Sequence, residues 1–317
     1  MDCQYLANTF SGKILNPVSK FMNKVYSSRN ENPWLISGSP RSGTTWLAEL
    51  IAEAEKNRLI WEPLQEGNSD KHSYNFSKRP LYNPIKKDEI NDFQITFFDK
   101  LLSGENLNIH NLRLRAYSLN IFNTLGNRRL IIKFVRGNGV VGYLHEHFNI
   151  PKPVVIIRHP CAVIASQLRM GRWDDHPHID ENLIKLYPHI KSVIENASSL
   201  EERLAVTWAG DVLAAKLWEN NIQIVYYEDL VLNGNVVLEK IFSEWGYNEV
   251  PENCLNKLNQ PSSTSKIWST SDSGMEKLKG WNKYLSEDQV TKIFATIKSM
   301  GVDDYDENSY LPKYNLQ

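Results

Sequence analysis

A short run of glycine, serine, threonine and arginine near the start of the chain has the composition of a phosphate-binding loop. Residues 38–45 (GSPRSGTT) lie between an apolar, strand-like run and a segment with helical periodicity. In that position a glycine-spaced loop directs backbone N–H groups and the positive end of the helix dipole toward an anion. A Walker loop has Lys after its second glycine, whereas this chain has Thr44 there and places its cation, Arg41, inside the loop. The pattern predicts an anion site that lacks the lysine with which a Walker loop contacts a γ-phosphate. The alternative is an ordinary strand-to-helix turn.

A second pair of polar residues follows another apolar run. Arg158 ends the segment VVIIR, and Ser166 comes eight residues later, which is about two turns into the helix expected next. Ligands of open α/β sheets bind at the carboxyl ends of the strands. Arg158 and Ser166 are therefore predicted to contact a ligand together. Arg169 is interpreted as a solvated helix charge, and contact with the same ligand is the less favoured alternative.

The segments that position these residues alternate between strand and helix patterns. Short apolar runs typical of buried parallel strands cover residues 34–38, 58–63, 129–134, 153–157 and 222–227. Helical periodicity covers residues 43–56, 92–102, 111–125, 161–170, 201–220, 235–246 and 286–300. This alternation predicts an α/β fold with a single doubly wound parallel sheet and helices on both faces.

The chain is organised as one domain with two accessory segments. Residues 1–31 lack sustained periodicity and are expected to form an N-terminal arm, whereas residues 32–317 form the domain. Within the domain, residues 64–125 begin with a stretch rich in Asn, Lys, Ser, Pro and Tyr. This segment is predicted to form a lid or insert over an acceptor pocket.

Composition and charge narrow the possible partners. With 36 basic and 37 acidic residues, the formal net charge is −1, so no overall positive field attracts nucleic acid. Three widely spaced cysteines favour reduced thiols in the cytoplasm over a disulfide framework. No run of about 18 apolar residues marks a membrane span. We therefore expect a cytoplasmic protein without nucleic-acid or membrane partners, and a homodimer is one possible state.

The first loop resembles a known family motif. The string GSPRSGTTWL is similar to the 5′-phosphosulfate loop of sulfotransferases that use 3′-phosphoadenosine-5′-phosphosulfate (PAPS) and release adenosine 3′,5′-bisphosphate (PAP). The resemblance implies a P-loop NTPase-like sulfotransferase fold, with Trp46 stacked on adenine. It also implies that the 5′-phosphate and sulfonate contact Arg41, Ser42, Gly43, Thr44 and Thr45.

Two further motifs extend this resemblance. The pattern R-x-P-x-A-V-x-x-S, with Arg158, Pro160 and Ser166, is similar to the 3′-phosphate signature of carbohydrate-type and bacterial members. It implies that Arg158 and Ser166 hold the donor's 3′-phosphate. The string YEDL resembles a family motif whose tyrosine lies near adenine, which implies that role for Tyr227.

The C-terminal part of the chain departs from the family pattern. The usual R-K-G segment before G-D-W is poorly matched by GMEKLKGWNKYL, in which only Gly280 and Trp281 align. Lys277 and Lys279 are candidates for the missing positive charge, and solvated lysines are the alternative. The strand histidine of many small-molecule members is also absent, because Lys133 keeps the lysine position while Val135 stands where the histidine would be.

Sulfonate transfer needs a base for the acceptor and cations for the leaving phosphate oxygen. Glu62 lies in an E-P-L context similar to that of the base proposed for carbohydrate-type members. The resemblance therefore implies Glu62 as base, with Lys133 and Arg41 stabilising the leaving group. His72 is an alternative base, and no metal is expected.

The acceptor is predicted from composition alone. Aromatic side chains in residues 64–125, among them Tyr74 and Phe76, and the later Trp173 and Asp174 are expected to contact it. The mixed charge of these segments favours a small molecule with a hydroxyl, less readily an amine, such as a natural product. A carbohydrate or glycolipid acceptor, a P-loop kinase and a non-catalytic PAP-binding module are the alternatives.

Overall fold

The structure is a computed structural model of the 317-residue chain. It describes residues 32–54, 57–64, 92–104, 129–135, 137–171, 179, 181–262 and 274–313. The expected N-terminal arm and helix 111–125 lie outside these residues, as does most of the expected lid.

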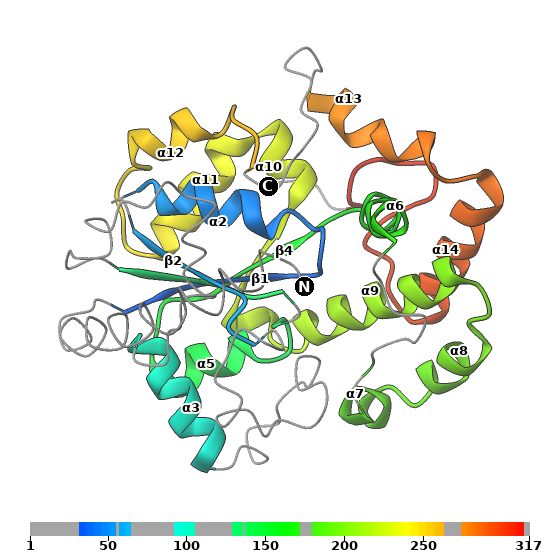
Figure 1. The fold of residues 1–317 in the computed structure, drawn as a ribbon, viewed down its shortest axis with the longest axis horizontal. Helices are drawn as coiled ribbons and strands as arrows, with labels where there is room; N and C mark the ends of the chain where they lie inside the picture. The colour runs from blue at the N-terminus through cyan, green and yellow to red at the C-terminus, as the bar shows by residue number, and fades with distance from the viewer. Residues whose placement is uncertain are drawn as a thin grey trace, which may run out of the picture.

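A five-stranded parallel sheet forms the centre of the domain (Figure 1). Its strands are β1 (Trp34–Gly38), β2 (Arg58–Trp61), β3 (Leu130–Lys133), β4 (Val154–Ile157) and β5 (Gln223–Tyr226). They lie in the order β2-β3-β1-β4-β5, with every neighbouring pair parallel. The predicted doubly wound parallel sheet is therefore confirmed.

The strand order reverses its winding direction at the central strand. The chain places β3 on one side of β1 and β4 on the other, so the loops that follow β1 and β4 leave in the region where the winding direction reverses. Such a reversal point is where open α/β sheets bind ligands. Gly38 pairs with Ile156, and Lys133 lies level with both Ile36 and Trp61, so these strand ends share one edge of the sheet.

Helices cover the sheet on both faces, as predicted. The helices α2 (Thr44–Ala52), α10 (Tyr227–Leu232), α11 (Gly234–Glu244) and α12 (Glu252–Lys257) cover one face. On the other face lie α3 (Asp92–Leu102) and α5 (Val141–Phe148).

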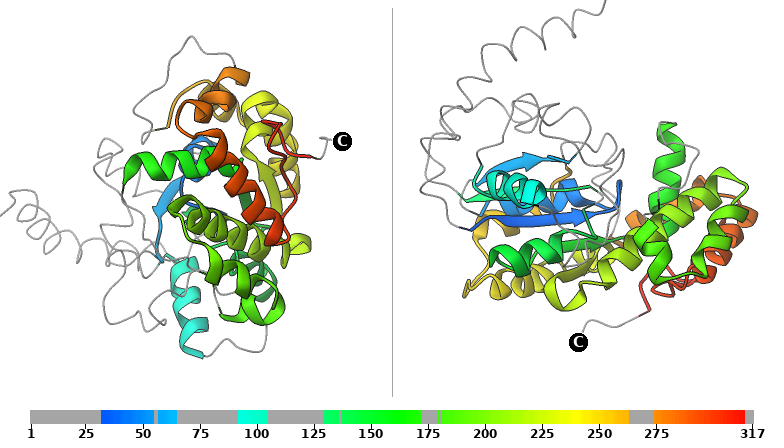
Figure 2. Two further views of the ribbon diagram at one scale, coloured as in Figure 1. Left: turned by 90° about the vertical axis from the view of Figure 1, so that its right-hand side faces the viewer. Right: turned by 90° about the horizontal axis from the view of Figure 1, so that it is seen from below.

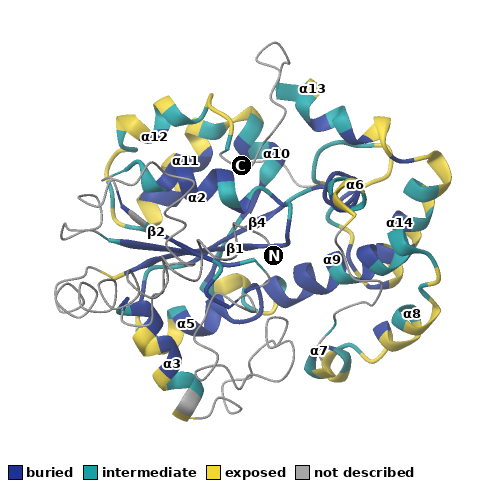
Figure 3. Cartoon of the chain, in the orientation of Figure 1, coloured by how far each residue is buried: buried dark blue, intermediate teal, exposed yellow. Residues whose placement is uncertain are grey.

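Successive residues of β1 supply both cores. Trp34 and Ile36 pack in the core under α2 and α11, whereas Leu35 packs with α3 and α5, because side chains alternate between the faces of a strand. All residues of β1, β3 and β4 are buried (Figure 3). This double-sided burial explains why these strands read as continuous apolar runs in the sequence.

A third core lies beside the sheet and consists of helices (Figure 2, right). It contains α6 (Pro160–Met170), α7 (Glu181–Leu186), α8 (Ile190–Asn196), α9 (Leu200–Lys216) and α14 (Glu287–Ser299). Helix α9 joins the two parts, because its middle packs in this third core while Ala215 packs against the sheet.

Short helices connect these elements. They are η4 (Glu219–Asn221), α13 (Gly274–Lys279) and η5 (Gly280–Lys283), of which η5 packs against α6. Among the described helices, none is long and apolar enough to cross a lipid bilayer.

Several predicted boundaries differ from the structure by a few residues, and one of these differences concerns a site residue. The sequence placed Tyr227 at the end of a strand, but β5 ends at Tyr226 and Tyr227 opens α10. Glu228 and Asp229 lie in the first turn of α10, where carboxylates interact favourably with the helix dipole. Tyr227 consequently leaves the sheet at the edge where open α/β sheets bind ligands.

Candidate functional site

The loop after β1 makes a tight turn into α2. The Ser42 N–H donates to the Ser39 carbonyl at 3.0 Å, and both Arg41 (φ 76°) and Gly43 (φ 102°) have left-handed backbone conformations. A left-handed arginine costs about 1 kcal/mol or more and persists only where its surroundings enforce it. The loop therefore holds Arg41 in a strained conformation, as binding loops often do.

Neighbouring elements fix this loop in place. A Cβ atom added to Gly43 would lie 2.6 Å from Cδ2 of Tyr227, so the close approach of the tyrosine ring requires glycine there. On the other side, the Gln167 amide donates to the Pro40 carbonyl at 3.1 Å. The loop is thus braced by α10 and α6, which come from distant parts of the sequence.

The N-terminus of α2 has the features of an anion-binding site. Among the described residues, no side chain caps this nine-residue helix, and its first turn holds no acidic residue. Its N–H groups and dipole therefore have no negative partner in that part of the chain. The Ser42 hydroxyl, fully buried, has no hydrogen-bond partner among the described residues. A buried hydroxyl without a partner is costly, and a bound phosphate oxygen would satisfy it.

Two arginines from different strand ends meet over this loop. Arg41 Nε donates to Ser166 Oγ at 2.9 Å, and Arg158 Nη1 donates to the Arg41 carbonyl at 3.2 Å. The Arg158 guanidinium lies 4.2 Å from the ring centroid of Tyr227, and its buried Nε has no partner among the described residues. Both predicted phosphate-binding clusters are therefore parts of one site.

The electrostatics of this site also favour an anion. Burial lowers the pKa of Arg41, and the charges of Arg158 and Arg169 lower it further. Within the described part of the chain, none of these arginines forms an ion pair with a carboxylate. Clustered positive charge that lacks a counter-ion attracts anionic ligands.

A lysine and a glutamate lie beside the loop at the ends of β3 and β2. Lys133 is 1% exposed and Glu62 is 19% exposed, and Lys133 Nζ lies 2.5 Å from Glu62 Oε1. The same ammonium lies 3.5 Å from Thr45 Oγ1 and 4.3 Å from the ring centroid of Trp61. Lys133 therefore bridges the predicted base and the first turn of α2.

The backbone at Glu62 explains its position. The Glu62 N–H donates to the Lys133 carbonyl at 2.7 Å, which extends the pairing of β2 with β3 by one residue. Glu62 itself has φ 39°, a left-handed value that is uncommon outside glycine. Arg41, in the loop after β1, and Glu62, directly after β2, thus both adopt strained conformations, and such local strain is often associated with function.

The two predicted adenine-contacting residues pack against each other. Trp46 and Tyr227 have ring centroids 5.8 Å apart in an edge-to-face arrangement. The Trp46 indole is 5% exposed and donates to the Gln260 carbonyl at 3.1 Å, so it packs mainly as a core residue. Stacking of Trp46 on adenine stays a prediction, and Tyr227 is the more accessible of the pair.

A buried network holds the backbone of Arg158. Glu228, 1% exposed, accepts from the His159 N–H at 3.0 Å and from the Tyr305 hydroxyl at 2.7 Å. The Trp208 indole donates to the Arg158 carbonyl at 3.1 Å. Both sides of Arg158 are therefore fixed by buried hydrogen bonds, and Tyr305 carried no sequence signal for this role.

His159 is held neutral within that network. Burial lowers its pKa to about 3, and the charge of Arg158 lowers it further, although a hydrogen bond from the ring to the Ser309 carbonyl opposes the shift. The ring also stacks on Trp281 with centroids 4.9 Å apart. Burial acts in the opposite sense on Glu228, whose pKa it raises.

We expect the burial of His159 to make the stability of the fold decrease as the pH falls. The pKa of about 3 in the folded state lies below the ordinary value of 6.5. The contribution of neutral His159 to the free energy of unfolding is therefore fully present above pH 6.5. As the pH falls from 6.5 toward 3, the unfolded chain binds a proton that the folded chain does not, which costs up to about 1.4 kcal/mol per pH unit. Urea melts between pH 7.5 and 4.5 should show a shallower loss of stability for His159→Gln than for wild type.

The difference in the pH dependence of stability between wild type and His159→Gln reports on His159, because Glu228 is present in both proteins. Its raised pKa favours the folded state at low pH and therefore opposes the effect of His159. Parallel pH profiles for wild type and His159→Gln would contradict a neutral, buried His159.

Most predicted acceptor residues lie outside the described part of the chain. This applies to Tyr74, Phe76, Trp173 and Asp174, and to the alternative base His72. Two aromatic residues of the expected lid are described, namely Phe97 and Phe98 on α3, and both pack in the core beneath the sheet. They stabilise the fold and do not face an acceptor.

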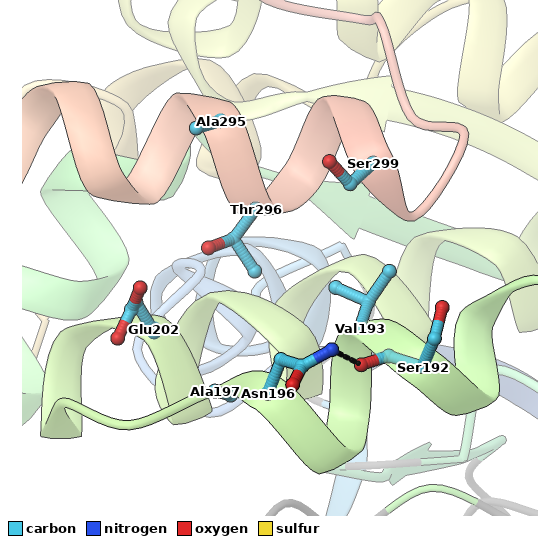
Figure 4. Close-up of a pocket in the computed structure, with 8 residues that line it drawn as sticks. All are labelled: Ser192, Val193, Asn196, Ala197, Glu202, Ala295, Thr296 and Ser299. Atoms are coloured by element: carbon cyan, nitrogen blue, oxygen red, sulfur yellow. Dashed lines mark hydrogen bonds between the residues drawn. The ribbon is translucent and has the colours of Figure 1, made fainter.

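A cleft of about 290 Å³ lies between α8 and α14, away from this site (Figure 4). Its polar side chains bond to their own helices, since Asn196 donates to the Ser192 carbonyl and Ser192 to that of His189. Glu202, also in its lining, caps α9. Ser299, also in the lining, makes no such hydrogen bond within the described residues, so these internal bonds engage most of the polar groups of the cleft.

A match to a family model assigns the chain to a known family. The model of the sulfotransferase family matches residues 33–251, a range that contains the loop after β1, Glu62, Lys133, Arg158 and Ser166. A search of curated proteins finds no match. Among solved structures, mouse sulfotransferase SULT7A1 complexed with PAP is similar at 15% identity over 89% of this chain and 90% of that chain, with a TM-score of 0.42. Because the family model spans more than half of its length, the chain belongs to the sulfotransferase family.

Proposed function

We propose that this sulfotransferase transfers the sulfonate group of PAPS to a hydroxyl, less readily an amine, of a small-molecule acceptor. The observation that carries the proposal is the position of Lys133, whose ammonium contacts both Glu62 and Thr45. A cation placed between a carboxylate and an anion-binding helix N-terminus is suited to group transfer from a phosphate.

The described residues fit the donor. The uncapped N-terminus of α2, the unsatisfied Ser42 hydroxyl and Arg41 are suited to the 5′-phosphate and sulfonate. Arg158 and Ser166 are suited to the 3′-phosphate, since the buried Nε of Arg158 lacks a partner among the described residues. Charge-assisted hydrogen bonds from forked guanidinium groups to phosphate are among the stronger polar interactions.

The chemistry then follows from the two strand-end residues. Glu62 accepts the proton of the acceptor hydroxyl, whose oxygen forms a new bond to sulfur. The bond from sulfur to the 5′-phosphate oxygen breaks, and its electron pair stays on that oxygen. Lys133 and Arg41 stabilise the negative charge that develops there, so this proposal needs no metal ion.

The acceptor contacts and the cellular compartment are proposed from the sequence and the cysteines. Tyr74, Phe76, Trp173 and Asp174 are proposed acceptor contacts on their sequence pattern alone. Cys161 and Cys254 are free and buried in the structure, which supports the proposal that the protein acts in the reducing cytoplasm.

Calorimetric titration tests the donor assignment without knowledge of the acceptor. We expect PAP to bind at least about 100-fold more tightly than ADP with Mg²⁺, because a 3′-phosphate adds charge-assisted bonds of roughly 1.5–3 kcal/mol each. Arg158→Ala should weaken PAP binding by about 10- to 100-fold and ADP binding much less.

Arg203→Ala is a matched control, because Arg203 lies on α9 and bonds to the Ser198 carbonyl. It should bind PAP as wild type does. Preference of the wild type for ADP would support the kinase alternative, and equal losses of PAP and ADP affinity in Arg158→Ala would remove Arg158 from the 3′-phosphate site.

A further inference from the structure

Arg169 lies one helical turn beyond Ser166 on α6. Residues three apart on a helix share a face, and on this face Ser166 Oγ accepts the hydrogen bond from Arg41 Nε at 2.9 Å. The charge of Arg169 acts on Arg41 and contributes to its lowered pKa. Arg169 is exposed, as the sequence suggested, and is also close to the arginines of the site.

A tyrosine holds the Arg169 guanidinium without using its donors. Arg169 Cζ lies 4.0 Å from the ring centroid of Tyr284, which directly follows η5. Stacking engages the face of the guanidinium and leaves the N–H groups at its edge free for an anion. Within the described residues, Arg169 makes no hydrogen bond or ion pair that would occupy those groups.

Of the two lysine candidates from the sequence, Lys279 lies near a carboxylate. Lys279 Nζ lies 3.8 Å from Glu276 Oε1 and 5.7 Å from the ring centroid of Tyr310. Its charge is thus partly balanced by a carboxylate of its own helix, unlike that of Arg169. This contrast matters because the chain lacks the family's C-terminal basic segment.

We propose that Arg169, held by Tyr284, is a third donor to the 3′-phosphate of PAPS, beside Arg158 and Ser166. The inference rests on the proposed function and deepens it by naming the residue that supplies the missing cation. Two guanidinium groups and a hydroxyl that bind one phosphate would favour nucleotides with a 3′-phosphate. A nucleotide without that phosphate would gain no affinity from Arg169.

The test compares PAP with AMP, which lacks the 3′-phosphate, by calorimetry on the full chain. Arg169→Ala should lower PAP affinity about tenfold, as expected for loss of a hydrogen-bonded charge, and leave AMP affinity within about twofold of the wild-type value. Tyr284→Leu removes the stacking platform but not the charge, so a smaller loss that is also confined to PAP is expected. Lys279→Ala and Lys277→Ala are matched controls and should bind both nucleotides as wild type does.

The outcomes separate this inference from the proposed function. If wild type does not prefer PAP over AMP, the proposed donor is wrong and Arg169 loses its role with it. If wild type prefers PAP and Arg169→Ala keeps the full preference, or if a lysine variant alone loses it, only the role of Arg169 is overturned. Circular dichroism shows whether Arg169→Ala is folded. If it is not, Arg169→Gln is titrated instead and should show the same selective loss of PAP affinity.

Discussion

Replacement of Glu62 by glutamine is expected to lower turnover by about 10²- to 10⁴-fold, the usual contribution of a general base. Glutamine has the size of glutamate and can accept a hydrogen bond from Lys133 through its amide oxygen, but it cannot take the acceptor proton. Binding of PAP should therefore stay at the wild-type level. This selective loss would separate an enzyme from a non-catalytic PAP-binding module.

Turnover is measured with PAPS that carries a radiolabelled sulfonate and a panel of phenols, alcohols and amines. Glu249→Gln provides the matched control. It makes the same substitution at an exposed glutamate that lies outside the site. Full turnover by Glu62→Gln with unchanged PAP affinity would show that another group, such as His72, is the base.

Loss of the Lys133 charge should have an effect of similar size. Lys133→Met is expected to reduce the rate of sulfonate transfer by about 10²- to 10³-fold, as for removal of one group that stabilises the leaving oxygen. Methionine suits the site because Lys133 is almost completely buried, with its ammonium over the Trp61 ring. Glu62 is partly exposed, so water can solvate its carboxylate when the ammonium is absent.

Single-turnover kinetics with saturating PAPS measure the transfer step directly. Lys133→Arg, which keeps the charge in a bulkier group, should retain more activity than Lys133→Met. If Glu62 and Lys133 act in one step, the double variant should lose much less than the product of the two single losses. A Lys133→Met variant that transfers sulfonate at the wild-type rate would assign leaving-group stabilisation to Arg41 alone.

The sequence determined the fold class and the composition of the site. Strands buried on both faces are largely apolar, so β1, β3 and β4 were visible as short apolar runs. The loop after β1 was recognisable because its glycine, serine and arginine residues are adjacent in the chain. Likewise, Glu62 and Arg158 each follow a strand directly, and a local pattern is enough to find them.

Local patterns were less informative at element boundaries. The start of α10 at Tyr227 depends on where β5 stops pairing with β4, after Tyr226. The burial of Trp46 depends on α10 and on the Gln260 carbonyl, which is 214 residues away in the chain. Periodicity cannot supply such information, because it reports only which residues share a face of their own element.

Only the tertiary structure decided which of these residues act together. The contact of Arg41 with Ser166 joins positions 125 residues apart, and that of Lys133 with Glu62 joins positions 71 apart. Each depends on the strand order β2-β3-β1-β4-β5, which brings the ends of β2, β3, β1 and β4 to one edge of the sheet. The contact of Arg169 with Tyr284, and the anchoring of Arg158 by Tyr305, follow from the packing of segments that are distant in the chain. The sequence names the groups that can do chemistry, but their distances come from packing between segments that are remote along the chain.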